Sequence, residues 1–237
     1  MAQMRLDKFL AYMGIASRKE LKQIIRSGRV CVNGAAVTQP EFKLEAESCT
    51  VTLDGRPLSY TRFHYYMMDK PTGILSVTED KKQDTVLSLV TPEMRRMGLF
   101  PVGRLDKDTS GLLLLTDDGD FAHRVISPKS GVQKLYYARV DGRLDEKDIA
   151  AFDGGIVLKD GTQCLPAKLE IVGENECFVT VMEGKYHQVR RMLASRGAPV
   201  LELRRLSIGA LRLDDSLGPG GFRELDQTEI QLVYNAT

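Results

Sequence analysis

The sequence predicts an α+β protein with a small N-terminal helix–helix–sheet module, residues 1–60, and a larger domain with a mixed or antiparallel sheet, residues 61–237. Its 237 residues are 43% apolar, which is enough for one small and one medium core. Helical and strand patterns at the beginning of the chain are followed by a polar segment near 57–63, which we interpret as a linker. Beyond it, candidate strands occur in adjacent groups with helices between them, which favours α+β over a doubly wound sheet.

Two short helices and a hairpin are predicted for the beginning of the chain. Apolar residues recur at helical spacing over residues 6–13. A second helix is expected to begin at Ser17, which forms a capping-box pattern with Glu20, and to end at Gly28. A short strand pattern then leads into Asn33-Gly34, which is the strongest short-range signal for a hairpin.

The remaining chain shows clear patterns for both strands and helices. The candidate strands are 49–53, 64–69, 99–104, 111–116, 134–143, 164–172, 177–183 and 200–213. The candidate helices are 84–90, 118–126, 145–153, 187–196 and 226–234. The segments with possible chemistry lie within these elements or in the turns beside them.

Local charge differs from global charge in this chain. The net charge is only +1, so overall charge does not predict a nucleic-acid partner. Residues 5–30, however, carry seven cations and two anions, and residues 184–212 carry seven cations and one anion. Most charge runs are solvated helix faces, but cations clustered on a preformed helix pair neutralise phosphates, which favours RNA binding. The expected RNA contacts of the N-terminal stretch are Arg5, Lys8, Arg18, Lys19, Lys22, Arg26 and Arg29.

Residues 103–119 contain the most informative arrangement in the sequence. Asp106 lies in a polar turn that soon runs into the apolar residues 112–115. A carboxylate beside a buried strand either reacts or pairs with a cation, and Arg104 is a candidate for that cation. Asp108 is expected to cap or order the same turn. The residue types alone leave both roles of Asp106 open.

Two further segments supply aromatic and basic side chains. Tyr136 and Tyr137 point to opposite sides of a predicted strand, so at most one of them faces a cleft. A tyrosine in a cleft can stack on a base, and the alternative is a core tyrosine. Arg190 and Arg191 project about 100° apart from a predicted helix, so one can face a buried acid while the other meets phosphate.

Metal sites, disulfides and membrane spans are not expected. His64, His123 and His187 show no ligand spacing, and no cysteine pair supports a metal site. The four cysteines contain no CxxC pair and the N-terminus has no apolar signal segment, so we expect reduced thiols in the cytoplasm. The longest aliphatic run, residues 112–115, is far short of the roughly 20 residues that a membrane span needs.

Taken together, these motifs resemble the RsuA family of pseudouridine synthases over nearly the whole chain. The resemblance is carried by residues 70–73, 103–119, 134–136 and 184–192. Residues 4–50 also resemble a small RNA-binding module named after a ribosomal small-subunit protein. The resemblance implies that the small module docks onto structured RNA and that the larger domain is a pseudouridine synthase domain.

The resemblance also implies roles for particular residues. Asp106 is expected as the catalytic aspartate, Tyr136 as the aromatic side chain against the target uracil, and Arg190 as the basic partner of Asp106. No metal and no organic cofactor is implied. Asp69 departs from the family pattern, in which asparagine is common at this position. The further expected RNA contacts are Lys70, Arg104, Lys185 and Arg191.

The expected function is isomerisation of one uridine in ribosomal RNA, by a monomer that acts on free RNA or on an assembling small subunit. The residues Tyr186-His187-Gln188 are similar to the branch that acts on 16S rRNA, the uridine-516 type. One alternative is a relative that acts on 23S rRNA, and another is a non-catalytic rRNA-binding assembly factor. A glycoside or nucleoside hydrolase is a third alternative, but Asp108 is too close to Asp106 to be a convincing second acid.

Overall fold

The computed structural model describes residues 3–235, which divide into two compact units. One unit comprises the chain up to His64 together with Val90–Leu99, and the other comprises Tyr65–Leu89 and the chain from Phe100 onward. The sequence predicts a single boundary after residue 60. Residues 90–99 instead group with the first unit, where the Arg96 guanidinium donates to the Gly14 carbonyl at 3.0 Å. Such a long-range contact leaves no local pattern in the sequence.

The first unit combines short helices with a four-stranded antiparallel sheet in the order β3-β2-β5-β6. Its helices are α1 (Leu6–Tyr12), α2 (Arg18–Arg26) and α3 (Pro92–Arg96). Its strands are β1 (Gln3–Arg5), β2 (Val30–Val32), β3 (Ala35–Ala36), β4 (Lys43–Glu45), β5 (Val51–Leu53) and β6 (Arg56–Leu58). Strand β1 pairs with β4, and neither strand was predicted.

The local signals at the beginning of the chain are confirmed. Ser17 caps α2, and Glu20 completes the capping box by accepting from the Ser17 amide. Helix α2 ends at Arg26, and Gly28, two residues later, has the left-handed φ of +74° that is common just after a helix. Asn33 and Gly34 both have positive φ, 48° and 81°, as a type I′ hairpin turn between β2 and β3 requires.

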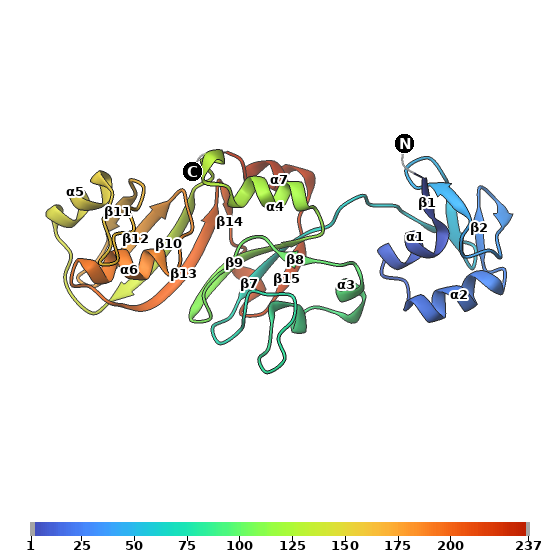
Figure 1. Cartoon of the computed structure of the whole chain (residues 1–237), viewed down its shortest axis with the longest axis horizontal. Coiled ribbons are helices and arrows are strands. Elements are labelled where there is room, and N and C mark those ends of the chain that lie inside the picture. The colour runs from blue at the N-terminus through green and yellow to red at the C-terminus, as the bar shows by residue number, and fades with distance from the viewer. Residues whose placement is uncertain (1–2, 236–237) are drawn as a thin grey trace. The chain divides into compact units, whose positions relative to one another are not determined.

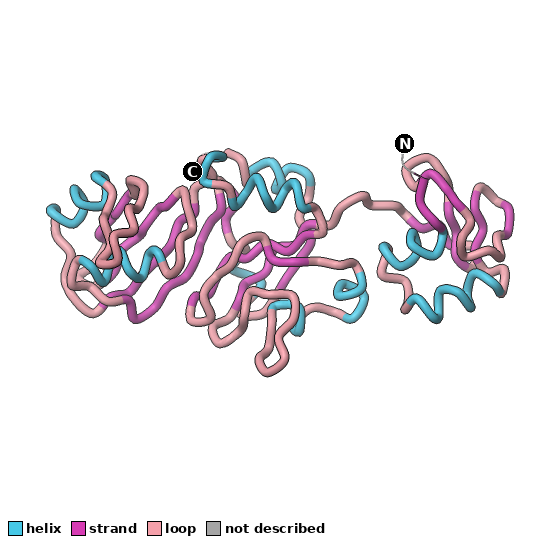
Figure 2. Tube along the Cα trace, viewed as in Figure 1, coloured by secondary structure: helices cyan, strands magenta, loops and turns pink. Residues whose placement is uncertain are grey.

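The second unit is built on a nine-stranded mixed sheet (Figures 1 and 2), in which the main path runs β11-β12-β10-β13-β9-β7-β15. Its strands are β7 (Tyr65–Lys70), β8 (Phe100–Pro101), β9 (Thr109–Thr116), β10 (Lys134–Val140), β11 (Lys168–Ile171), β12 (Glu176–Val181), β13 (Val200–Ile208), β14 (Leu211–Arg212) and β15 (Phe222–Glu224). The β13–β9 pair is parallel, and the other strand pairs of this sheet are antiparallel. The predicted α+β fold class is confirmed.

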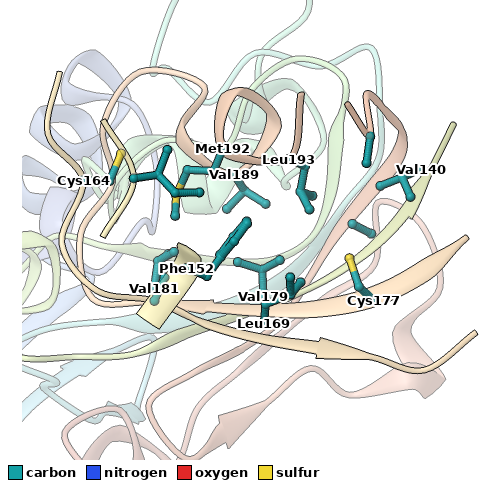
Figure 3. Close-up of a cluster of buried hydrophobic side chains, with 14 of the residues drawn as sticks. Val140, Phe152, Cys164, Leu169, Cys177, Val179, Val181, Val189, Met192 and Leu193 are labelled. Atoms are coloured by element: carbon teal, nitrogen blue, oxygen red, sulfur yellow. The ribbon is translucent and has the colours of Figure 1, made fainter. Parts of the chain in front are cut away.

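Four α-helices of the described residues pack on this sheet. The buried apolar side chains between helices and sheet form two clusters. The helices are α4 (Gly119–Ile126), α5 (Glu146–Gly154), α6 (Gln188–Ser195) and α7 (Gln227–Leu232). Figure 3 shows the cluster in which Met192 and Leu193 of α6 and Phe152 of α5 pack with Val179 and Leu169 of the sheet. Helices α4 and α7 contribute to the other cluster, over the half that contains β9 and β7. No helix within residues 3–235 is long and apolar enough to cross a membrane.

Most predicted elements of the second unit are present, and three differ. The predicted strand 99–104 is reduced to the two residues of β8, and the predicted helix 84–90 is a single 3-10 turn, Val86–Ser88. The predicted strand 200–213 is split into β13 and β14 by Gly209, which has a φ of +54° and turns the chain into a hairpin. Strand β15 was not predicted, because its three residues have no pattern without β7 beside them.

The two halves of the sheet meet at a close backbone approach between β9 and β13. Gly111 of β9 has a φ of +102° and is paired with Arg205 of β13. A Cβ atom at position 111 would overlap the Arg205 carbonyl oxygen and lie 2.7 Å from its amide nitrogen. Only glycine fits there, for reasons of both backbone conformation and space.

We predict that Gly111→Ala lowers the free energy of unfolding by at least about 2 kcal/mol, because the methyl group forces β9 and β13 apart. Gly119→Ala is the matched control, since Gly119 has ordinary φ and open space around its Cβ position. We expect the control to change stability by no more than about 0.5 kcal/mol. Urea denaturation of both variants checks this, and equal midpoints would contradict the role assigned to Gly111.

Candidate functional site

Asp106 lies in a turn that leads into the central strand β9. The Asp106 carbonyl accepts from the Thr109 amide at 3.0 Å, which closes the turn. About 30% of the Asp106 side chain is exposed, toward a pocket formed by this turn, β10, the end of β12, the start of α6 and β13. The pocket is lined by Arg104, Leu105, Asp106, Thr109, Tyr136, Val181, Glu183, Gly184, Lys185, Gln188, Val189 and Leu203.

Lys70 binds the backbone of the Asp106 turn through its side chain. Its side chain is fully buried, and its ammonium donates to the carbonyls of Asp106 (3.2 Å), Thr109 (2.9 Å) and two neighbouring residues. Burial lowers the pKa of Lys70 to about 8, while the nearby charge of Asp106 acts in the opposite direction. The expected contact of Lys70 with RNA is wrong for this structure, because the ammonium has no exposed surface and its hydrogens are used within the protein.

Tyr136 lies in the pocket and is held by a buried arginine. It is paired in register with Arg205 of β13, whose guanidinium lies 5.9 Å from the centre of the Tyr136 ring and 3.4 Å from its hydroxyl. Arg205 is 4% exposed and also donates from Nε to the Leu112 carbonyl at 2.8 Å. Tyr137 packs instead against Phe178, with ring centres 6.1 Å apart. As predicted, only one of the two tyrosines lines the pocket.

Arg190 does not pair with Asp106. Its guanidinium donates to the Asp108 carbonyl at 2.9 Å and reaches the Val200 carbonyl at 3.5 Å. The predicted ion pair between Arg190 and Asp106 is therefore not present in this structure. Helical spacing places Arg190 correctly near the turn, but the side chain holds the backbone of Asp108 rather than the carboxylate of Asp106.

His187 is the basic side chain that faces Asp106. Its Nε2 lies 3.5 Å from Asp106 Oδ1, and its backbone has a left-handed φ of 48° at the N-terminus of α6. The preceding loop is fixed by buried Glu183, which accepts from Gln188 Nε2 at 2.9 Å. Burial raises the pKa of Glu183, but hydrogen bonds from Lys185, Leu165 and Gln188 outweigh this and lower it.

The sequence analysis used His187 and Gln188 only to assign the branch of the family, rejected His187 as a metal ligand, and did not name Arg205, Glu183, His187 or Gln188 as members of the site. The position of His187 at a predicted helix start, beside a basic patch, is a signal that could have marked it. Arg205 was counted only within that patch, because its register with Tyr136 depends on strand pairing. Among residues 3–235, no three His, Cys, Asp or Glu side chains group as metal ligands would.

The other expected RNA contacts of the second unit differ in whether their charged groups are already bound within the protein. Arg104 is exposed at the pocket. The Lys185 ammonium binds Glu183 at 2.7 Å and the Gln163 carbonyl at 2.6 Å. Arg191 pairs with Asp160 at 2.5 Å. Hydrogen bonds from Thr162 and then from Arg191 lower the pKa of Asp160 to about 2.

The seven expected cations of the first unit are all exposed. Two of them form ion pairs, Arg5 with Asp7 at 2.7 Å and Arg29 with Asp54 at 2.5 Å. A groove beside α1 and α2 is lined by Arg5, Asp7, Lys8, Ala11, Arg18 and Lys22. Lys19, Arg26 and Arg29 do not line this groove. Phosphate binding is the role that such a cluster supports best.

Comparison with known proteins gives full-length matches. Residues 64–195 match the family model described as RNA pseudouridylate synthase, and residues 4–48 match the S4 domain model. The chain is 44% identical over 234 residues to the Bacillus subtilis protein named uncharacterized RNA pseudouridine synthase YtzG, covering 97% of this chain and 98% of that protein.

Relatives with a more specific name are also similar over their whole length. Ribosomal small subunit pseudouridine synthase A of Escherichia coli is 40% identical over 234 residues, covering 97% of this chain and all of that protein. The Vibrio cholerae protein of the same name is 40% identical over 232 residues, covering 98% and 100%. A solved structure titled crystal structure of pseudouridylate synthase has a TM-score of 0.69 and 35% identity, covering 97% of this chain and 99% of that one.

We predict that Lys70→Met lowers the free energy of unfolding by about 2 kcal/mol at pH 7, because the carbonyls of the Asp106 turn lose a charged donor. The difference should depend on pH. The folded pKa of Lys70 is about 8, below its ordinary value of 10.5, so the folded state binds fewer protons than the unfolded state between these values. The stability of the unaltered protein relative to Lys70→Met should therefore rise from pH 8 to 10.5.

Urea denaturation at several pH values from 7 to about 10.5 measures this difference. Lys82→Met is the control, since Lys82 is exposed on the same unit, and it should show neither the loss nor the pH dependence. A difference between Lys70→Met and the unaltered protein that stays constant with pH would contradict the assigned shift.

Proposed function

The chain belongs to the RNA pseudouridylate synthase family, and we propose that it converts one uridine of small-subunit ribosomal RNA to pseudouridine with Asp106 as the catalytic carboxylate. As a member of this family it is an isomerase. The observation that carries the proposal for Asp106 is its position, partly exposed in the same pocket as Tyr136, at the entrance to the central strand of the family domain.

The reaction explains why a carboxylate is needed in this pocket. The bond between the uracil and the ribose breaks, the base turns over, and a carbon–carbon bond forms in its place. An ionised carboxylate beside the ribose can attack the anomeric carbon as a nucleophile, or it can remove a ribose proton as a base. Asp106 serves either route, and the Lys70 ammonium holds the backbone of its turn by donating to the Asp106 carbonyl at 3.2 Å.

Tyr136 supplies the second requirement, which is to hold the detached uracil. A base stacked on a tyrosine gains roughly 1–3 kcal/mol, enough to keep it in the pocket while it turns over. Buried Arg205 fixes the orientation of Tyr136 through its hydroxyl and ring face. Nothing in this sequence of steps requires a metal or an organic cofactor.

The substrate is proposed from the relatives and the S4 domain. Proteins named ribosomal small subunit pseudouridine synthase A match this chain from end to end at 40–41% identity. We propose a 16S rRNA target of the uridine-516 type, modified by a monomer in the cytoplasm. The target must leave its stack, which costs a few kcal/mol, and basic contacts to the RNA backbone offset that cost. The exposed cations of the first unit support this role.

We predict that Asp106→Asn abolishes pseudouridine formation on 16S rRNA while RNA binding survives, because the amide keeps the shape of the side chain but cannot act as nucleophile or base. Asp108→Asn is the matched control, two residues away in the same turn, and should keep most of the activity. Pseudouridine formation and equilibrium RNA binding are measured for both variants. Residual activity of Asp106→Asn near that of the unaltered protein would remove Asp106 from the chemistry.

The same assay separates isomerisation from hydrolysis. A hydrolase would release free uracil from the RNA, whereas an isomerase keeps the base attached. We expect no free uracil to accumulate as pseudouridine forms.

We predict that cells lacking this chain lose one pseudouridine from 16S rRNA, and that the chain with Asp106 restores it while Asp106→Asn does not. Pseudouridine mapping of 16S and 23S rRNA makes the comparison. Loss of a 23S site instead would move the substrate to the large subunit. If every rRNA site persists, the ribosomal assignment is wrong.

A further inference from the structure

We propose that the stacked side chains of Tyr186 and His187 form a platform for the base of a nucleotide that flanks the target uridine. The platform would be a specificity-determining part of the site, because it contacts the RNA beside the nucleotide that reacts. The inference rests on the proposed function, since it takes RNA to be the substrate of the Asp106 pocket.

Exposure is the first observation that supports the platform. Tyr186 is 76% exposed, more than any other large apolar side chain among residues 3–235. Its ring stacks on the His187 ring with centres 4.0 Å apart and planes 16° from parallel. A single exposed tyrosine is ordinary, but a flat aromatic pair that presents most of its outer ring to solvent is suited to a second flat partner.

The platform is also held in place before any RNA binds. The Lys185 amide donates to Gln188 Oε1 at 3.0 Å, and Gln188 is tied to buried Glu183. The Arg191 guanidinium reaches the Tyr186 carbonyl at 3.4 Å, and Arg191 is itself anchored by Asp160. Because the loop is already ordered, stacking on it costs little conformational entropy.

The position of the platform beside Asp106 indicates that its ligand is a nucleobase. His187 Nε2 lies 3.5 Å from Asp106 Oδ1, so the platform begins beside the carboxylate that must meet the target ribose. When the target uridine leaves the helix stack, each flanking base loses a stacking partner. An aromatic face next to the pocket replaces that partner for one of the two flanking bases, whatever its sequence, because every base has a π-face.

The test is a coupling measurement between Tyr186 and the flanking bases. Short 16S rRNA fragments that contain the mapped target uridine are made intact, with an abasic site on its 5′ side, and with one on its 3′ side. Dissociation constants are measured for the full chain in the Asp106→Asn background, with Tyr186 intact or as Tyr186→Ala. We expect Tyr186→Ala to weaken binding of the intact fragment by about tenfold.

For the protein with Tyr186 intact, one of the two abasic fragments should bind about tenfold more weakly than the intact fragment. For Tyr186→Ala, the same abasic fragment and the intact fragment should bind equally well. Tyr186→Phe, which keeps the ring, should recover the affinity that Tyr186→Ala loses. Val172→Ala is the control for an exposed apolar side chain outside the pocket, since Val172 is 52% exposed. It should leave all dissociation constants unchanged.

The platform is overturned if Tyr186→Ala binds the intact fragment as tightly as its parent does. It is also overturned if Tyr186→Ala weakens binding by the same factor for the intact fragment and for both abasic fragments. The latter result would mean that Tyr186 contacts something other than a flanking base, such as a ribosomal protein or the RNA backbone. Failure of the proposed function is a separate result, because the unaltered protein would then form no pseudouridine in the intact fragment.

Discussion

The close backbone approach of Gly111 and Arg205 is the constraint on which the rest of the second unit depends. It forms the parallel pair that joins one half of the sheet, β11-β12-β10-β13, to the other half, β9-β7-β15. The Asp106 turn enters from one side of this junction and Tyr136 lies on the strand next to it on the other side. The carboxylate and the aromatic ring therefore share a pocket only because two strands, distant in sequence, meet without a side chain between them.

Buried charged side chains gather at the same junction. Asp69 is 1% exposed and accepts from the Arg204 guanidinium at 2.9 Å, while Lys70 and Arg205 on the same strands bind backbone carbonyls. Isolated buried charges are costly, and the hydrogen-bond partners of these groups offset part of that cost. Asp69, which departs from the expected family pattern, forms this ion pair with Arg204.

Features set by neighbours in sequence could be predicted, and features set by strand pairing could not. The capping box of Ser17 and Glu20 and the Asn33-Gly34 turn depend on contacts within a few residues, and both are present. The role of Lys70 depends on the position of β7 beside the Asp106 turn. The hydrophobic periodicity of the sequence does not predict that position. Arg190 was placed near the correct turn by helical spacing, but spacing does not choose between a carboxylate and a carbonyl as its partner.

Water exclusion around Asp106 has to come largely from the substrate. Residues 112–115 of β9 are each no more than 1% exposed, so this strand is buried along that stretch. The Asp106 carboxylate is 30% exposed and the His187 side chain is 40% exposed, so without RNA both side chains contact water while the strand beside them is buried. Electrostatic interactions strengthen when water leaves. If Asp106 is the catalytic carboxylate that we propose, an RNA that covers the pocket completes the environment for its reaction, and recognition of the surrounding nucleotides becomes part of the chemistry.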